Sequence, residues 1–306
     1  MDAFISYSSS DRARARRLDG ALRAAGISVW RDTSEIRLGV LLGDELREAI
    51  LGCRVLVLLW SERAEKSRWV NCEWLLALLQ DRFILPCTLD DAPLPQCLQN
   101  DVALPVHRLT KDVVSRLVRA IEDAGDARTP LAPLIRSEPP ELRDLILEIG
   151  YGQQQMTDAL AGDLEEAAKI QTTLDTVMEG ARAAWPLDPM IVNLDGYHLK
   201  NAYMLEHWGA IQAGRAPEDP VLDRAERRFY ETLAIDPTDP SALNGLGTIL
   251  FFKRDLNAAE FFQSAAIAVA KKRGQAYPAA EHDIEMVRYY KAQQQAASSD
   301  PHGASD

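Results

Sequence analysis

Two residues of different chemical character lie four positions apart in this chain and together would suit a small ligand. Trp69 and Glu73 belong to Trp69–Leu79, a segment whose apolar residues have helical spacing. Residues i and i+4 share one helix face, so the indole and the carboxylate are expected side by side. The indole offers a stacking surface for a planar group, with negative charge next to it. Taken alone, each residue also has an ordinary reading, as a core tryptophan and a solvated glutamate.

The elements around this pair predict where it lies. Short apolar segments alternate with segments of helical periodicity, which predicts a parallel sheet with helices on both faces. Ligands bind such sheets beyond the carboxyl ends of the strands, here at Tyr7–Ser9, Trp30–Asp32 and Ser61. The expected strands are Ala3–Tyr7, Ile27–Trp30, Arg54–Trp60, Phe83–Thr88 and Pro105–Leu109, and the expected helices are Asp11–Ala25, Leu42–Leu51, Trp69–Leu79 and Lys111–Ala124.

Five motifs in the first 125 residues occur in the order and spacing of a known family. They are DAFISYSSSD at 2–11, GISVWRD at 26–32, DTSEIRLG at 32–39, AI at 49–50 leading into CRVLVLLWS at 53–61, and S-x-W-x-x-x-E at 67–73. Together they resemble the Toll/interleukin-1 receptor (TIR) domain. The resemblance implies a flavodoxin-like fold with a parallel five-stranded sheet. It also identifies residues 32–39 with the family's BB loop.

The resemblance also implies an activity. In TIR enzymes the glutamate of the last motif cleaves the bond between nicotinamide and ribose in NAD⁺, so Glu73 is the catalytic candidate. The residues expected to contact the substrate are Tyr7, Ser8, Ser9, Asp32, Leu38, Gly39, Ser61 and Trp69. NAD⁺ is the substrate, and no separate cofactor or metal is expected. Ile36, Leu38, Ser8 and Ser9 differ from residues often found in enzymatic relatives, so hydrolysis and cyclisation both stay open.

The first half of the chain also permits other interpretations. Many TIR domains are scaffolds without activity, so a protein that acts only by binding is the alternative. One expected helix carries four arginines close together, Arg12, Arg14, Arg16 and Arg17. They form either a solvated helix face or a surface for assembly. A receiver domain would need acidic residues after the first strand, where this chain has Ser8–Ser10. A thiol nucleophile at Cys72 lacks a nearby histidine, and neither the four cysteines nor the five histidines have metal-binding spacing.

The second half of the chain differs in composition and pattern. Residues 1–125 carry 17 basic and 18 acidic side chains, whereas residues 126–306 carry 17 and 28, within a total net charge of −12. Four prolines interrupt the segment 123–140. We therefore predict a TIR domain at 1–125, a linker at 126–140, an α-helical domain at 141–297 and a disordered tail at 298–306. The spacing Ala225 to Ala259, 34 residues, resembles a tetratricopeptide repeat, with Leu187–Gly214 as a degenerate preceding unit. A plain helical bundle is the alternative.

These observations also limit location and partners. No window approaches the roughly 18 consecutive apolar residues of a membrane span, and the N-terminus lacks the pattern of a secretory signal. A cytoplasmic protein with reduced thiols is expected. The acidic second half argues against direct nucleic-acid binding. The resemblance implies self-association through the TIR domains, and in bacteria an immune effector. The helical domain is expected to receive a protein or small-molecule trigger.

Overall fold

The computed structural model of this chain describes residues 1–31, 49–50, 52–80, 82–99, 103–124, 129 and 139–299, with side chains up to residue 294. By its contacts the chain divides into two compact units, Met1–Leu134 and Ile135–Asp306, called here the α/β unit and the helical unit. Most of the predicted linker, 126–140, lies outside the described residues. The predicted domain boundaries therefore stay predictions.

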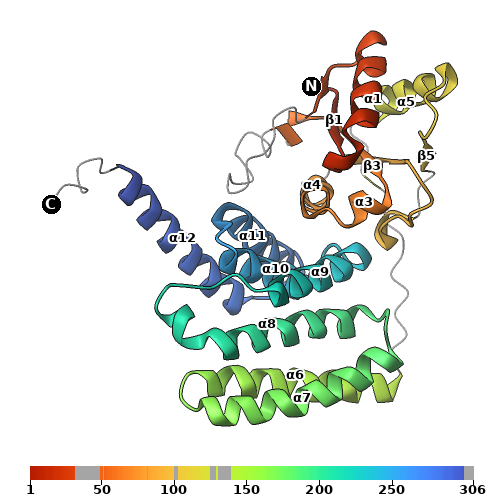
Figure 1. Cartoon of the computed structure of the whole chain (residues 1–306). Coiled ribbons are helices and arrows are strands. Elements are labelled where there is room, and N and C mark those ends of the chain that lie inside the picture. Colours follow the sequence, from red (N-terminus) through yellow and green to blue (C-terminus); the bar gives the residue numbers. More distant parts are fainter. Residues whose placement is uncertain are drawn as a thin grey trace. The chain divides into compact units, whose positions relative to one another are not determined.

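The α/β unit is built on a five-stranded parallel sheet of order β2-β1-β3-β4-β5, as predicted (Figure 1). Its strands are β1 Ala3–Ser6, β2 Val29–Trp30, β3 Val55–Trp60, β4 Phe83–Thr88 and β5 Leu104–Pro105. The last strand was expected at Pro105–Leu109 and is shorter and earlier. Pro105 has no N–H to donate, and β5 is an edge strand that ends there, as proline favours.

Helices cover both faces of this sheet, because the strand residues alternate between two apolar surfaces. On β3 every residue is buried, and Val55, Val57 and Leu59 belong to a core shared with Leu18 and Leu117. These last two residues lie on α1 (Arg12–Ala24) and α5 (Lys111–Asp123). The helix α4 (Arg68–Leu79) packs against β1, β3 and β4. Figure 1 shows α4 across the sheet from α1 and α5.

Local sequence signals fix where these helices begin. Ser67 caps α4, and its side chain accepts a hydrogen bond from the Val70 backbone N–H; Thr110 caps α5 in the same way through Val113. A short helix that the sequence did not predict, α3 (Glu62–Glu65), follows β3 and is capped by Ser61. The predicted helix Leu42–Leu51 lies almost wholly outside the described residues, and so does the predicted BB loop, residues 32–39.

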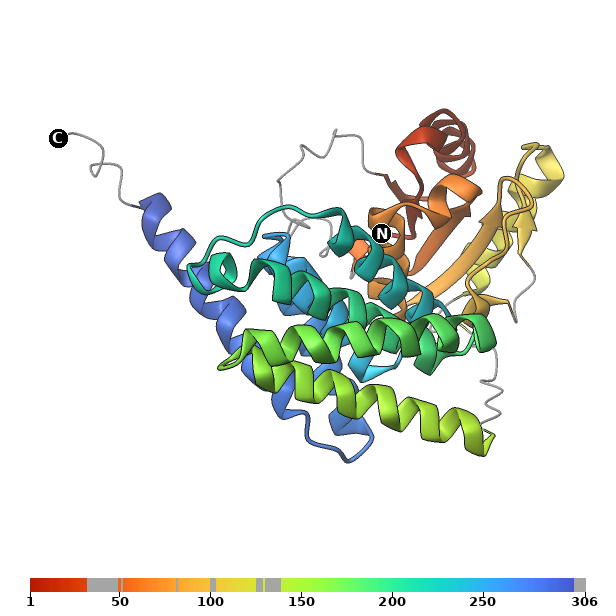
Figure 2. The ribbon, with the colours of Figure 1, turned by 60° about the horizontal axis from the view of Figure 1, so that its bottom comes forward.

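The helical unit consists of helices throughout its described part. They are α6 Pro140–Leu160, α7 Leu164–Ala184, α8 Pro189–Gln212, α9 Pro220–Ile235, α10 Pro240–Phe252, α11 Leu256–Lys272 and α12 Pro278–Ser299. Helices adjacent in sequence pack together as α6 with α7, α8 with α9, and α10 with α11; Figure 2 shows the first pair side by side. The helix α12 continues through Ser299, and the rest of the predicted tail, 298–306, lies outside the described residues.

Aspartate residues start five consecutive helices of this unit, which accounts for part of its acidic composition. Each aspartate side chain accepts a hydrogen bond from a backbone N–H in the first turn. Such a cap contributes about 1 kcal/mol to the stability of a helix. The negative charge of the carboxylate also interacts favourably with the positive end of the helix dipole. The five residues, which open α7 to α11 in order, are Asp163, Asp188, Asp219, Asp239 and Asp255.

Glycines allow the closest approach between these helices. A Cβ built on Gly245 of α10 would lie 2.4 Å from the ring of Phe229, which belongs to α9 and is fully buried. The segment Leu187–Gly214, expected to be a degenerate repeat unit, holds α8, which is kinked at His207. That the unit is built from tetratricopeptide repeats stays a prediction. No helix in the described part of the chain is both long and apolar enough to cross a membrane.

Candidate active site at the carboxyl edge of the sheet

The carboxylate of Glu73 lies over the carboxyl end of β1. Ser6 is the last residue of that strand, and its hydroxyl donates a 2.6 Å hydrogen bond to Oε2 of Glu73. Alternation along β1 explains the contact, since Ala3 and Ile5 belong to the core under α1 and α5, whereas Ser6 points to the opposite face. That face is the one against which α4 packs. Two adjacent elements thus hold the pair in place.

Burial makes this hydrogen bond important for Glu73. The glutamate is 7% exposed and Ser6 is fully buried. A carboxylate removed from water is costly unless hydrogen-bond donors replace its hydration, and an O–H donor to a charged oxygen forms one of the stronger hydrogen bonds. The result is an acidic group in a largely dry setting with a fixed orientation. Such a group is suited to stabilising positive charge that develops on a neighbouring molecule.

A second buried hydrogen bond joins the segment after β1 to the segment after β3. Ser61 follows β3, and its hydroxyl donates to Oδ2 of Asp11 over 2.7 Å, while its oxygen also accepts from the Ala64 backbone N–H. Both side chains are nearly inaccessible, with exposures of 1% for Ser61 and 3% for Asp11. The contact ties the chain after β1 to the chain after β3. Ser61, which was predicted to contact substrate, is therefore engaged within the protein.

The other predicted residues are placed as follows. Tyr7 packs against the core under α1 and α5, and its hydroxyl accepts a 3.3 Å hydrogen bond from Nη1 of Arg31. Ser8 is buried and precedes the turn Ser9–Asp11, in which Ser9 is exposed. Trp69 is half-buried in the first turn of α4, on the same helix as Glu73.

The structure brings Ser6, which was not predicted, to Glu73, and the predicted substrate contacts of Tyr7, Ser8, Ser9 and Trp69 stay predictions. Asp32, Leu38 and Gly39 lie outside the described residues, so their predicted roles stay predictions.

Sequence reasoning missed Ser6 and Asp11, although both lie inside the first motif. A signal for Ser6 was available in the strand alternation. It is the one polar residue of a buried strand, on the face opposite Ala3 and Ile5. A buried hydroxyl requires a partner, so its position marked it as a residue with a specific contact. Nothing in the sequence pattern distinguished Asp11 from the exposed charges that follow it.

Two of the four cysteines of this unit are poor nucleophiles. All four are free and buried. Burial raises the pKa of Cys53 to about 11 and that of Cys87 to about 12, so both thiols stay protonated at neutral pH.

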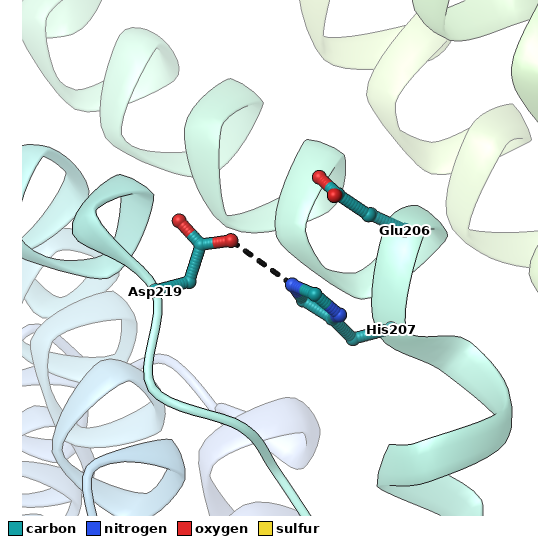
Figure 3. A group of neighbouring side chains, drawn as sticks. All are labelled: Glu206, His207 and Asp219. Atoms are coloured by element: carbon teal, nitrogen blue, oxygen red, sulfur yellow. Dashed lines mark hydrogen bonds and ion pairs between the residues drawn. The ribbon is translucent and has the colours of Figure 1, made fainter.

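One group of possible metal ligands occurs in the described residues of the helical unit. Glu206, His207 and Asp219 each offer one ligand atom, and these atoms lie within 4.8 Å of one another (Figure 3). Asp219, however, already has two functions. One of its oxygens caps α9 through the Val221 N–H, and the other lies 2.9 Å from Nε2 of His207. The hydrogen bond from His207 lowers the pKa of Asp219. This group therefore serves to join the kink of α8 at His207 to the start of α9.

The strand order defines the α/β unit as a flavodoxin-like domain, and its buried carboxylate lies at the carboxyl edge of the sheet, where domains of this fold bind ligands. Residues 3–118 match the family described as TIR domain, and this part of the chain is a TIR domain. It is also 28% identical over 111 residues to a Methanobrevibacter olleyae protein named "Probable 2' cyclic ADP-D-ribose synthase TcpO". The match covers 35% of this chain, and the chain spans about a third, 32%, of that relative.

Proposed function

We propose that the TIR domain cleaves the bond between nicotinamide and ribose in NAD⁺, with Glu73 as the catalytic carboxylate. The observation that carries this proposal is the buried Ser6–Glu73 hydrogen bond at the carboxyl edge of the sheet. The printed name of the Methanobrevibacter relative, a cyclic ADP-ribose synthase, supports the same chemistry. Its product requires that the nicotinamide–ribose bond of an NAD⁺-like substrate be broken.

The chemistry suits a single oriented carboxylate. Nicotinamide is a cationic leaving group in NAD⁺, so no general acid has to protonate it. As the bond lengthens, positive charge develops on the ribose, and a nearby carboxylate stabilises this oxocarbenium-like transition state. Ser6 keeps the Glu73 oxygen in one direction, so little reorganisation is needed during the reaction. The acceptor of the ribosyl group is water in hydrolysis or a hydroxyl of the same nucleotide in cyclisation.

The remaining parts of the proposal concern control. We assign the helical unit a regulatory function, in which binding of a protein or small-molecule trigger sets the activity of the TIR domain. Self-association of TIR domains, with residues 32–39 completing the site, is part of the same hypothesis. An enzyme that consumes NAD⁺ has to be silent at rest, which is consistent with an immune effector that acts only when triggered.

A second candidate function is a TIR scaffold that acts only by binding other proteins. The observation that favours it is the same burial of Glu73, since a carboxylate that is 7% exposed and bonded to Ser6 is also what a purely structural pair would show. The two functions differ in a single measurable outcome, the release of nicotinamide.

The test is the rate of nicotinamide release from NAD⁺ by the full chain and by Glu73→Gln. Loss of one preorganised electrostatic group is expected to lower the rate by about 10²–10³-fold. Glu65→Gln is the matched control, because Glu65 is an exposed glutamate on the neighbouring helix α3. Unfolding curves of both variants show whether the fold is retained. A Glu73→Gln variant with normal turnover would show that Glu73 is not catalytic. Absence of release from every form, over a range of protein concentrations, would favour the scaffold.

A further inference from the structure

The α/β unit carries a hollow, and none of the described residues predicted for the active site lines it. It has a volume of about 660 Å³ and lies between α1, α5 and the carboxyl ends of β3, β4 and β5. Leu59 of β3, which forms part of its lining, belongs to the core under α1 and α5. Glu73 contacts β1 from the opposite face of the sheet. The sheet therefore separates this cavity from the candidate active site.

Four permanently charged side chains surround the cavity, and all four are positive: Arg14 and Arg17 from α1, Arg108 before α5, and Lys111 in its first turn. Among the residues that the structure describes, no carboxylate belongs to the lining. We call this hollow the basic cavity. In a chain whose net charge is −12, such a concentration of one sign is unusual. It creates a local positive potential that attracts anions.

The protein itself neutralises little of this charge. Among the described residues, Arg14 is the one cation of the lining that lies near a carboxylate. Its Nη1 lies 3.8 Å from Oδ1 of Asp11, which is a long ion pair, and 3.4 Å from the carbonyl oxygen of Leu89. Within the described part of the chain, Arg17, Arg108 and Lys111 form no ion pair. Like charges held around one hollow repel each other, and a bound anion would relieve this repulsion.

The apolar residues of the lining indicate that the cavity suits an organic ligand rather than a simple inorganic anion. Leu109 and Val114 are half-buried and contribute accessible apolar surface to the lining, which also includes the buried Leu59 and Leu89. Apolar walls combined with a few charged groups, in a volume of about 300–1,000 Å³, are typical of sites for small organic ligands. The combination favours a molecule with a flat apolar part and a multiply charged part. Arginine is well suited to phosphate, because its guanidinium group donates hydrogen bonds to two oxygens at once.

We propose that the basic cavity binds a nucleoside diphosphate group, with the phosphates against Arg17, Arg108 and Lys111 and the base over the apolar residues of the lining. This site is separate from the one proposed for NAD⁺ cleavage, and it does not depend on that activity. Free nucleotides such as ADP, and larger molecules that contain an ADP group, carry the required chemistry. Binding here would place a nucleotide-sensitive site on the α1–α5 side of the TIR domain.

The test is equilibrium dialysis of the full chain with ADP, adenosine and pyrophosphate. ADP is expected to bind at least about tenfold more tightly than either fragment, because adenosine lacks the charged groups and pyrophosphate cannot use the apolar residues of the lining. Binding of ADP should also weaken as salt rises. Adenosine or pyrophosphate binding as tightly as ADP would overturn the assignment to a nucleotide.

Two double variants locate the bound ADP. Arg17→Glu with Lys111→Glu reverses two lining charges, one near each side of the cavity, and should weaken ADP binding by at least about tenfold. Arg16→Glu with Arg116→Glu is the matched control, since it makes the same charge change on exposed residues of the same two helices outside the lining. All four side chains are exposed, so both proteins should fold, which unfolding curves verify. Equal affinities of the two double variants would refute the proposal.

A third variant separates this site from the candidate active site. Glu73→Gln should leave ADP binding unchanged, because Glu73 contacts the opposite face of the sheet. If Glu73→Gln alters ADP affinity and the cavity variant does not, the nucleotide binds at the carboxyl edge above β1 and the basic cavity is not its site. If the cavity variant changes self-association in sedimentation but not ADP binding, the cavity is a protein contact and the proposal is wrong.

Discussion

Ser6 and Glu73 are 67 positions apart in the chain, and the hydroxyl of Ser6 donates a 2.6 Å hydrogen bond to the carboxylate of Glu73. One residue ends the first strand and the other lies in the middle of α4. This bond connects the stability of the TIR domain with the orientation of its proposed catalytic group. A change in Ser6 should therefore affect both properties.

Ser6→Ala is expected to lower the free energy of unfolding by about 1–3 kcal/mol, since it leaves a buried carboxylate oxygen without this donor. If Glu73 is catalytic, nicotinamide release should also slow by about 10–100-fold, the range for partners that orient a functional group. The effect should appear in kcat rather than KM. Ser10→Ala, which changes an exposed serine, is the control. Normal stability together with normal kcat would contradict the importance of this bond.

Asp195 of α8 holds three helices of the helical unit together. It is 1% exposed, and its two oxygens bind Nη1 of Arg182 from α7 at 2.6 Å and Nε of Arg228 from α9 at 2.7 Å. Removing one partner of a buried ion pair lowers the free energy of unfolding by about 3–5 kcal/mol. The cost is smaller here, because both arginines are more than a third exposed and can be hydrated when Asp195 is removed. We expect Asp195→Ala to destabilise the unit by about 2–4 kcal/mol in denaturant unfolding. The exposed Glu179→Ala on α7 should change stability by less than about 0.5 kcal/mol.

Two glycine-to-alanine changes in the helical unit should have opposite effects. In Gly245→Ala the new methyl group would lie 2.4 Å from the ring of Phe229, so α9 and α10 would have to move apart. Overpacking of this kind costs about 1–3 kcal/mol. Gly209→Ala in α8 meets no atom within 4 Å and should instead stabilise the unit by about 0.5–1 kcal/mol. Thermal unfolding of both variants gives the two signs directly. A Gly245→Ala variant as stable as the unchanged protein would contradict the packing described for Phe229.

His198 should make the stability of the helical unit depend on pH. Burial lowers its pKa from the ordinary value of 6.5, and the nearby Asp175 at 2.8 Å and Asp195 oppose this only in part. Arg182 acts in the same direction as burial. A lowered histidine pKa means that the unfolded chain binds the proton more readily. Neutral His198 therefore contributes fully to the free energy of unfolding at pH values above its ordinary pKa. This contribution is lost as the pH falls through the pKa of His198 in the folded protein.

We therefore expect the free energy of unfolding to decrease between about pH 7.5 and about pH 5.5, with a smaller slope in His198→Gln. His282→Gln, which removes an exposed histidine, should leave the slope unchanged. The check is a series of denaturant unfolding curves across this range. A slope that is the same in all three proteins would show that His198 does not titrate differently on folding.

If the helical unit controls the TIR domain, the piece Met1–Leu134 should differ in activity from the full chain. The two compact units divide at residue 134, so this piece keeps the whole sheet and its helices. The measurement is nicotinamide release by both proteins across a range of concentrations, after circular dichroism has shown that the piece is folded. Superimposed curves, with and without a candidate trigger, would mean that the helical unit does not regulate.

The sequence determined the type and order of most elements, because these follow from short-range patterns. Runs of buried β-branched and leucine residues such as 55–60 indicate a central parallel strand, and serine, threonine and aspartate caps mark where helices begin. The motif that contains Trp69 and Glu73 was likewise readable as a local pattern. The edge strand β5 was misplaced, since two residues held by one neighbour carry little pattern of their own.

Only the tertiary structure decided which polar residues meet. The partners of Glu73 and Ser61 lie 67 and 50 positions away, and each contact depends on how α4 and the strand ends pack rather than on spacing along the chain. For the same reason, four cations from two segments about 90 positions apart surround one cavity, because α1 and the segment before α5 lie on the same face of the sheet. Composition and periodicity fix the elements, whereas the sites arise where side chains from distant elements converge.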